Sequence, residues 1–455
     1  MNMTEGPVLG KMIRFTIPVM ASGVLQLLFN AADVAVVGQF AGDAAMAAVG
    51  SCGALINLII NLFIGLSVGA GVIAAQELGA RRYGEVDKLI STALTSSIIG
   101  GIAVMIFGIC MARPLLLLMD TPEDVLAEAV PYMRAYFCGM PGCLVYNYMA
   151  AILRSSGDTK RPLFFLTAAG VVNVILNLLM VLGLGLGAIG VGIATAGSQY
   201  VAAGLTLLYM SKTKTSLRLA GFKVYGKKLL RMVTIGLPAG LQGCMFSLSN
   251  VIIQSAVNAY PTVTIAGNTA AGNLEGFVYT AMNSVYHAAL TFIGQNMGAG
   301  KFERIKKISF QCAGLVLVIG LALSGLLVFF GDKLLLIYAS GENRDLIVQA
   351  GMNRLSIIAA TYFLCGLMDV GCGILRGMGK AVQPMIVSLL GSCVFRIVWV
   401  FTVCPLFPGQ IMALYISYPI SWIVTGGVHY IFCVYFYRKL MKRKKQTELS
   451  APATT

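Results

Sequence analysis

Residues 153–162 read LRSSGDTKRP, and residues 375–384 read LRGMGKAVQP. In both segments a Leu-Arg pair precedes a glycine-containing turn and a proline follows, so one motif occurs twice, 222 residues apart. Two further pairs of short segments repeat at nearly the same distance: QELG at 76–79 with QNMG at 295–298, and IP at 17–18 with LP at 237–238. The near-constant spacing of 219 to 222 residues predicts that the chain is a duplication of one long unit.

The composition indicates that this unit belongs in a membrane. Hydrophobic residues make up 58% of the 455 residues and charged residues 11%, whereas soluble domains carry about 25% charged residues. The length allows about a dozen spans of ~20 residues each. In such an apolar chain, duplicated halves are typical of secondary transporters, whose substrate path lies at the interface between the repeats.

The apolar runs predict an all-α polytopic membrane protein with 12 transmembrane helices in two lobes of six. We expect these helices near residues 13–40, 46–78, 89–112, 125–153, 162–183, 188–210, 229–259, 264–297, 307–330, 345–376, 382–404 and 411–437. Because each half has an even number of helices, both halves have the same orientation. Their pseudo-twofold axis should therefore run along the membrane normal.

Basic residues sort into alternate loops, which predicts the orientation. On one side the expected loops carry only three of them, Arg113, Lys333 and Arg344. The basic residues expected on the other side are Lys11, Arg14, Arg81, Arg82, Lys88, Arg154, Lys160, Arg161, Arg376, Lys380 and those within 212–231, 301–307 and 438–445. By the positive-inside rule both termini are cytoplasmic. We therefore interpret the net charge of +15 as a topology signal and expect no nucleic-acid partner.

The same patterns predict the domain boundaries. Residues 1–211 form the N-terminal lobe and residues 229–437 the C-terminal lobe. A basic cytoplasmic linker, residues 212–228, joins them, and residues 438–455 form a basic cytoplasmic tail that we expect to be disordered. We expect a monomer in a bacterial or archaeal inner membrane.

Enzymatic motifs are missing from the sequence. There is no phosphate-binding G-x-x-x-x-G-K-[ST] motif, and two histidines, His287 and His429, cannot form a zinc-protease motif. A G-x-G-x-x-G match at 185–190 falls in a short turn between two predicted spans, without a soluble strand before it. We therefore expect neither an enzyme nor a bound cofactor or structural metal.

The first half carries one ionisable residue deep in a predicted span. A carboxylate at bilayer depth costs roughly 2.5–3.5 kcal/mol on insertion scales, so Asp33 requires a reason. Asn173 and Asn177 share one helix face at i,i+4, and helical rise places them and Thr195 at a depth similar to that of Asp33. Together the four side chains predict an oxygen-rich site for H⁺ or a monovalent cation such as Na⁺. For Asn173 and Thr195 alone, ordinary interhelical hydrogen bonding is the simpler interpretation.

The second half has its own buried charges. Glu275 and Arg396 lie near mid-depth, where each would be costly alone, so we expect them to pair or to face a wet cavity. Structural pairing and substrate recognition both remain open for them. For Asp369, close to the cytoplasmic end, we expect a structural or gating role. Arg354 and its repeat counterpart Arg134 lie near outer helix ends, and we expect each to extend toward water or to contact a loop.

At this point the chain resembles the multidrug and toxic compound extrusion (MATE) transporters over nearly its full length, most closely the bacterial and archaeal members with an acidic first helix. The resemblance rests on the segments around Asp33, QELGA at 76–80, LRSSGD at 153–158 with its echo at 375–377, and Asn173-x-x-x-Asn177 followed by Gly-x-Gly and Ala194-Thr195.

The resemblance implies two six-helix lobes around a central cavity and efflux of cationic, amphipathic compounds, driven by inward H⁺ or Na⁺. It also implies a first-lobe cation site at Asp33, Asn173, Asn177 and Thr195. Related members often carry a second Asp where this chain has Asn177, which favours H⁺ here. The alternatives are a lipid-linked saccharide flippase of the same superfamily and, from another class, a channel or structural membrane protein.

Overall fold

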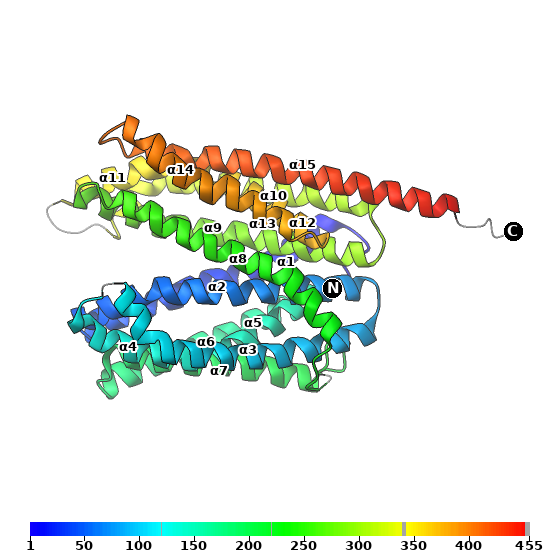
Figure 1. The fold of residues 1–455 in the computed structure, drawn as a ribbon, viewed down its shortest axis with the longest axis horizontal. Helices are drawn as coiled ribbons and strands as arrows, with labels where there is room; N and C mark the ends of the chain where they lie inside the picture. Colours follow the sequence, from blue (N-terminus) through cyan, green and yellow to red (C-terminus); the bar gives the residue numbers. More distant parts are fainter. Residues whose placement is uncertain (120, 220, 339–342, 451–455) are drawn as a thin grey trace. The chain divides into compact units, whose positions relative to one another are not determined.

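The computed structural model describes residues 1–119, 121–219, 221–338 and 343–450. These residues form helices and their connections, without a strand among them (Figure 1). In the first half the elements are α1 (Val8–Phe40), α2 (Asp43–Gly79), α3 (Tyr83–Leu118), α4 (Glu123–Cys138), α5 (Met140–Ser155), α6 (Lys160–Asn177), the π-helix η1 (Leu178–Gly183) and α7 (Gly187–Lys212). In the second half they are α8 (Gly226–Val257), α9 (Thr262–Gly298), α10 (Glu303–Leu335), α11 (Arg344–Ile357), η2 (Ala359–Thr361), α12 (Phe363–Gly377), α13 (Val382–Ser388), the π-helix η3 (Leu389–Val394), α14 (Phe395–Thr402), η4 (Cys404–Leu406) and α15 (Met412–Ser450).

The chain divides into two compact units. Unit 1 comprises Met1–Asn2 and Ala21–Cys244, and unit 2 comprises Met3–Met20 and Met245–Thr455. Two helices change unit along their length: α1 starts in unit 2 and continues in unit 1, and α8 starts in unit 1 and continues in unit 2. The first part of each half's first helix therefore packs with the other half of the sequence.

Most of the predicted spans are present as long apolar helices. Within the described residues nine helices are long and apolar enough to cross a membrane, and two bent pairs, α4 with α5 and α11 with α12, raise the number to eleven. The remaining predicted span, 264–297, coincides with α9, a helix of 37 residues. It packs against α10, α11 and α12 and buries polar residues such as Asn268 and Glu275. Because its neighbours shield these groups, α9 can be less apolar than the other helices.

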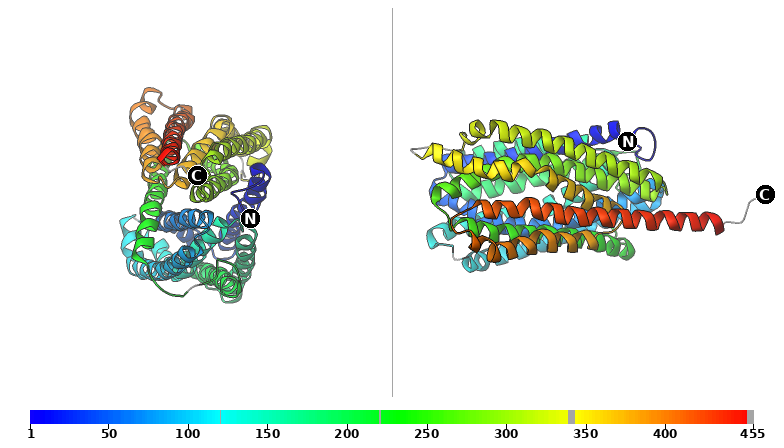
Figure 2. Two further views of the ribbon diagram at one scale, coloured as in Figure 1. Left: turned by 90° about the vertical axis from the view of Figure 1, so that its right-hand side faces the viewer. Right: turned by 90° about the horizontal axis from the view of Figure 1, so that it is seen from above.

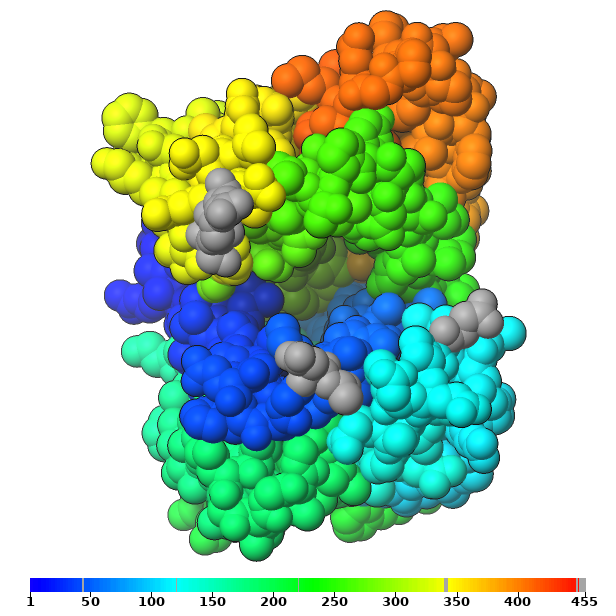
Figure 3. All heavy atoms as spheres, turned by 90° about the vertical axis from the view of Figure 1, so that its left-hand side faces the viewer, coloured from blue at the N-terminus to red at the C-terminus, as the bar shows by residue number. Residues whose placement is uncertain are grey.

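The fourth predicted helix of each half is broken rather than continuous. The bend is 44° between α4 and α5 and 42° between α11 and α12. At the first break a Cβ on Gly139 would lie 2.6 Å from Ala196 Cα of α7, so a side chain there would collide with backbone. Figure 3 shows the start of α11, drawn in yellow, in space-filling form.

The basic C-terminal segment does not match the expected disorder. α15 continues as a helix to Ser450 and extends beyond the neighbouring helices of unit 2 (Figure 2). The expectation fails because residues 438–446 are rich in Lys and Arg, which are good helix formers and simply prolong α15. Residues 451–455 of the expected tail lie outside the described residues.

Candidate cation site

The position of Asp33 depends on a close contact between α1 and α6. The ring of Phe29 occupies the space beside Gly170, where an added Cβ would lie 1.8 Å from a ring carbon. Phe29 precedes Asp33 by one helical turn, and Gly170 precedes Asn173 by three residues. The missing side chain at Gly170 thus allows α1 to approach α6 closely enough for the polar side chains of the next turn to meet.

The four residues predicted for this site are brought together in unit 1. Asn177 Nδ2 donates a hydrogen bond to Asp33 Oδ1 at 2.5 Å and a second to Asn173 Oδ1 at 3.3 Å. Asn173 Nδ2 in turn donates to Thr195 Oγ1 of α7 at 3.5 Å. Thr195 also interacts electrostatically with the Asp33 carboxylate. The chain of contacts links α1, α6 and α7.

Electrostatically, this is a carboxylate held by neutral groups. Within the part of the chain that the structure describes, Asp33 has no Lys, Arg or His nitrogen within 4.0 Å. Asn177 is fully buried, and its Oδ1 has no hydrogen-bond partner among the described residues. A partnerless buried oxygen is costly. This oxygen, Asn173, Thr195 and the Asp33 carboxylate form a donor set that suits a proton or a small hard cation.

The backbone around Asn177 is irregular. Asn177 is the last residue of α6, and the π-helical turn η1 begins directly after it. π-Helical turns are rare and often lie at functional sites. The fifth predicted helix of the other half also contains a π-helical turn, η3. Hydropathy gave no signal for either turn, because the change in hydrogen-bond register leaves the apolar pattern nearly intact.

In unit 2, Glu275 pairs with Arg354 and not with Arg396. Arg354 Nε and Nη2 donate to the two carboxylate oxygens at 3.0 and 2.7 Å, and Arg354 Nη1 donates to Asn268 Oδ1 at 2.6 Å. The expectation that Arg354 extends toward water is therefore wrong, because the buried Glu275 attracts its guanidinium inward. Arg134 occupies the equivalent position in the other half, so the sequence analysis gave both arginines the same role. The pairing of Arg354 with Glu275 was therefore not predicted.

Arg396 is buried without an acidic partner. Only 5% of its surface is exposed, and no Asp or Glu oxygen of the described residues lies within 4.0 Å of it. Its Nε donates to Ser421 Oγ at 2.8 Å, while Nη2 has no partner among the described residues. The guanidinium carbon lies 4.2 Å from the centre of the Tyr418 ring and 5.5 Å from that of Trp422. Aromatic rings thus replace a carboxylate as its main electrostatic contact.

Among the described residues, Asp369 of α12 makes no hydrogen bond with Glu275 or Arg354. It is half-buried and interacts with the hydroxyl of Tyr279 and with the charge of Arg376. Arg376 itself donates to the hydroxyl of Tyr286 at 2.6 Å. These contacts join α12 to α9, and a structural or gating role for Asp369 stays a prediction.

Comparison with known proteins identifies the family. The profile of the MatE family matches residues 18–179 and 238–402, which is one match in each half of the chain. Probable multidrug resistance protein YoeA of Bacillus subtilis is 26% identical over 441 residues, covering 95% of this chain and 94% of the relative. Probable multidrug resistance protein YpnP of the same organism is 27% identical over 402 residues, covering 87% and 88%.

A solved structure shares the fold. A MOP superfamily transporter from Pyrococcus furiosus superposes with a TM-score of 0.91 at 20% identity, covering 96% of this chain and 98% of that one. Membership excludes an enzyme and makes the protein a multi-pass membrane transporter of small molecules. The chain belongs to the MatE family.

Proposed function

We propose that this protein is a secondary active antiporter that exports cationic, amphipathic compounds in exchange for an inward cation. Family membership supports transport, and the names of the two Bacillus relatives support multidrug efflux. These names do not favour the alternative of a lipid-linked saccharide flippase. The protein lies in a bacterial or archaeal cell membrane as a monomer, with both termini cytoplasmic and a linker at residues 212–228 between two lobes.

The observation that carries the proposal is the environment of Asp33. Its carboxylate accepts a hydrogen bond from the Asn177 amide and interacts electrostatically with Thr195, but no cationic side chain of the described residues lies within 4.0 Å of it. Such a group changes its net charge when it gains or loses a proton or cation, and a ligand-dependent charge can bias two conformations. Asp33 is the coupling residue, and Asn173, Asn177 and Thr195 orient it and supply further oxygens.

We assign H⁺ as the coupling ion. The site contains one carboxylate, since its other members are two amides and a hydroxyl. A single charge suffices to bind a proton, whereas a dehydrated Na⁺ requires more oxygen ligands and gains from a second negative charge. Neither Glu275, which is engaged by Arg354, nor Asp369 belongs to this site.

The experiment is dye efflux from proteoliposomes with pH and Na⁺ gradients imposed separately. We expect the pH gradient to drive uphill movement of a cationic dye and Asp33→Asn to abolish it. Asp158→Asn is the matched control, because Asp158 pairs with Arg161 at the surface of unit 1; it should retain wild-type flux. Full proton-driven efflux by Asp33→Asn would contradict the proposal.

A further inference from the structure

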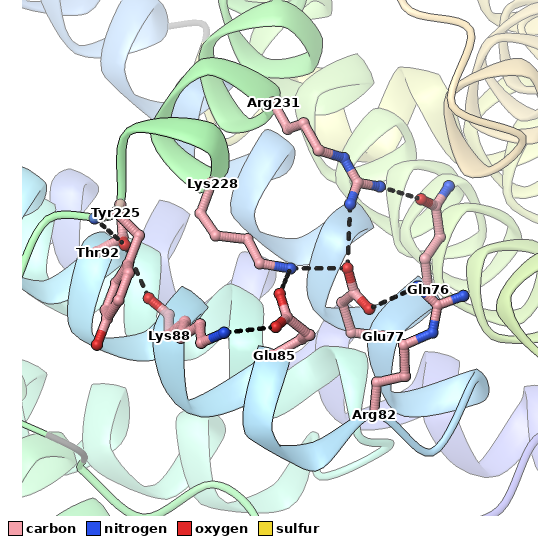
Figure 4. Close-up of polar contacts among 9 residues, drawn as sticks. All are labelled: Gln76, Glu77, Arg82, Glu85, Lys88, Thr92, Tyr225, Lys228 and Arg231. Carbon is pink, nitrogen blue, oxygen red and sulfur yellow. Dashed lines mark hydrogen bonds and ion pairs between the residues drawn. The ribbon is translucent and has the colours of Figure 1, made fainter.

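The start of α8 is held on unit 1 by a buried lysine. Lys228 Nζ lies 2.8 Å from Glu77 Oε1, near the end of α2, and 2.8 Å from Glu85 Oε2, in the first turn of α3 (Figure 4). Lys228 is 6% exposed and Glu77 is 3% exposed, so this contact is largely removed from water. A positive charge in the first turn of a helix opposes the helix dipole. The two carboxylates compensate Lys228 in this unfavourable position.

Further polar contacts join the same elements. Arg231 Nη1 lies 3.0 Å from Glu77 Oε1, and its Nη2 donates to Gln76 Oε1 at 3.3 Å (Figure 4). Just before α8, the backbone N–H of Tyr225 donates to Thr92 Oγ1 of α3 at 3.1 Å. We call Glu77, Glu85, Lys228 and Arg231 the α8 clamp. The QELG segment, one of the repeated motifs, supplies its central carboxylate.

Above this clamp α2 and α8 touch through glycines. A Cβ on Gly65 would lie 2.0 Å from Gly240 N, and one on Gly69 would lie 2.3 Å from Met232 O. A Cβ on Gly236 would lie 2.6 Å from Leu66 Cα. Both helices thus present a small-x-x-x-small face, which lets backbones meet. The same stretch of α8 also buries the apolar side chains of Met232, Ile235 and Ala239.

The repeat provides a counterpart to the α8 clamp at the start of α1. Here the QNMG segment of unit 2 holds Met3: its backbone N–H donates to Gln295 Oε1 at 3.2 Å, and its carbonyl accepts from Asn296 Nδ2 at 3.2 Å. Asn296 occupies the repeat position of Glu77. We call these contacts, with the apolar packing of Phe15 on Phe292 at a ring separation of 5.9 Å, the α1 clamp.

The two clamps differ in the forces that close them. The α1 clamp is backed by a hydrophobic core in which Met3, Met12 and Phe15 are completely buried. Opening it would expose apolar surface at about 25 cal/mol per Å². The α8 clamp consists of ion pairs, and the glycine crossing lies beside it. When it opens, water solvates the separated charges and offsets much of the lost attraction.

We propose that the α8 clamp is the releasable one, and that Glu77 and Lys228 position the first half of α8 on unit 1 in one state of the transport cycle and free it in another. The α1 clamp stays closed throughout. This inference rests on the proposed function, since alternating access requires two arrangements of the halves. Glu77 and Lys228 are thus positioning residues that contact neither the transported compound nor the coupling ion.

Amide hydrogen exchange of the full chain in lipid nanodiscs tests this, without substrate or ion gradient. Glu77→Gln and, separately, Lys228→Met should raise exchange over 226–244 by about tenfold or more and leave 8–20 within about twofold of wild type. Lys301→Gln is the matched control. It removes an exposed contact with Glu5 at 3.3 Å beside the α1 clamp, and it should leave exchange over 226–244 unchanged.

A second arm uses wild-type protein in liposomes during dye efflux driven by a pH gradient. Exchange over 226–244 should rise during turnover, and exchange over 8–20 should not. Unchanged protection of 226–244 in folded Glu77→Gln and Lys228→Met would overturn the proposal. If both variants fail to fold, the wild-type measurement decides: an equal rise in hydrogen exchange over 226–244 and over 8–20 during turnover would overturn the proposal. Absence of dye flux would refute the proposed function alone, because the first arm needs no transport.

Discussion

Single residues of this chain illustrate two ways of tolerating a charge in a membrane protein. Glu275 is neutralised by a bidentate arginine, which is a stable structural arrangement. Asp33 accepts a hydrogen bond from the neutral amide of Asn177, which does not neutralise its charge. The difference separates a residue that fixes a helix pair from one that, in the proposed function, responds to the coupling ion.

Asn177→Asp should convert the site toward Na⁺. The new carboxylate would replace an amide now 2.5 Å from Asp33 Oδ1. Two carboxylates this close cannot both be ionised unless a cation lies between them. We expect an imposed Na⁺ gradient to drive efflux in this variant and not in wild type. Asn173→Asp, further from Asp33 in the chain of hydrogen bonds, is the comparison. If a Na⁺ gradient has no effect on efflux by Asn177→Asp, the number of carboxylates in the site does not determine which ion is coupled to transport.

Glu275→Gln should destabilise unit 2 by about 3–5 kcal/mol, because it leaves the charge of Arg354 buried without a carboxylate. Thermal unfolding in detergent measures this as a lower midpoint. The double variant Glu275→Leu with Arg354→Met should recover much of the loss, since an apolar pair needs no compensation. If the double variant is as unstable as Glu275→Gln, a buried charge without a carboxylate is not what destabilises Glu275→Gln.

Sequence reasoning predicted that Asp33, Asn173, Asn177 and Thr195 lie together, as they do. Polar residues in apolar runs are conspicuous, and helical rise gives their depth. Sequence reasoning did not find the partner of Glu275, because 79 residues separate it from Arg354. It also missed the α8 clamp. Glu77 sits in a repeated motif, but only folding shows that Lys228, 151 residues later, reaches it.

At the scale of helices, glycines and irregular turns set the geometry. Phe29 fills the space beside Gly170, and Gly139 allows α7 to approach the break between α4 and α5. The hydropathy pattern predicted where helices run but not where they bend, because a bend leaves apolar residues apolar. Gly139 and Pro141 lie at the first break, within 125–153, which was predicted as one continuous helix. The second break, at η2, contains Ala359–Thr361, which include neither glycine nor proline.

Gly170→Ala should displace α1 from α6. Its methyl group would collide with the Phe29 ring, and overpacking of this kind costs about 1–3 kcal/mol. We expect slower efflux and a lower unfolding temperature. Phe29→Leu in the same chain should restore part of both, because it removes the colliding ring. Gly314→Ala is the control, since no atom lies within 4 Å of its would-be Cβ; it should be neutral or slightly stabilising.

At the scale of the whole molecule, the duplication explains both the likeness and the difference of the halves. Both contain a bent fourth helix and a π-helical turn in the fifth. The same repeated motif holds the start of α8 in one half and the segment before α1 in the other. The two halves therefore share an arrangement of helices but differ in single residues. At one repeat position the first half has Glu77 and the second has Asn296, and this position contacts the start of α8 in one half and the segment before α1 in the other.

The number of spans has a testable consequence for the C-terminus. If α9 crosses the membrane, the chain has twelve spans and the C-terminus lies on the same side as the N-terminus. If it does not, the eleven other spans place the end of α15 outside. The basic residues within 438–445 argue for the cytoplasm.

We therefore expect green fluorescent protein fused after Gln446 to fluoresce in cells, and alkaline phosphatase fused after Gly409 to be active. An insertion after Thr215, which precedes α9, should report the cytoplasm in either case. Active phosphatase at Gln446 together with inactive phosphatase at Gly409 would show that α9 does not span, and the parallel orientation of the two halves would fail with it.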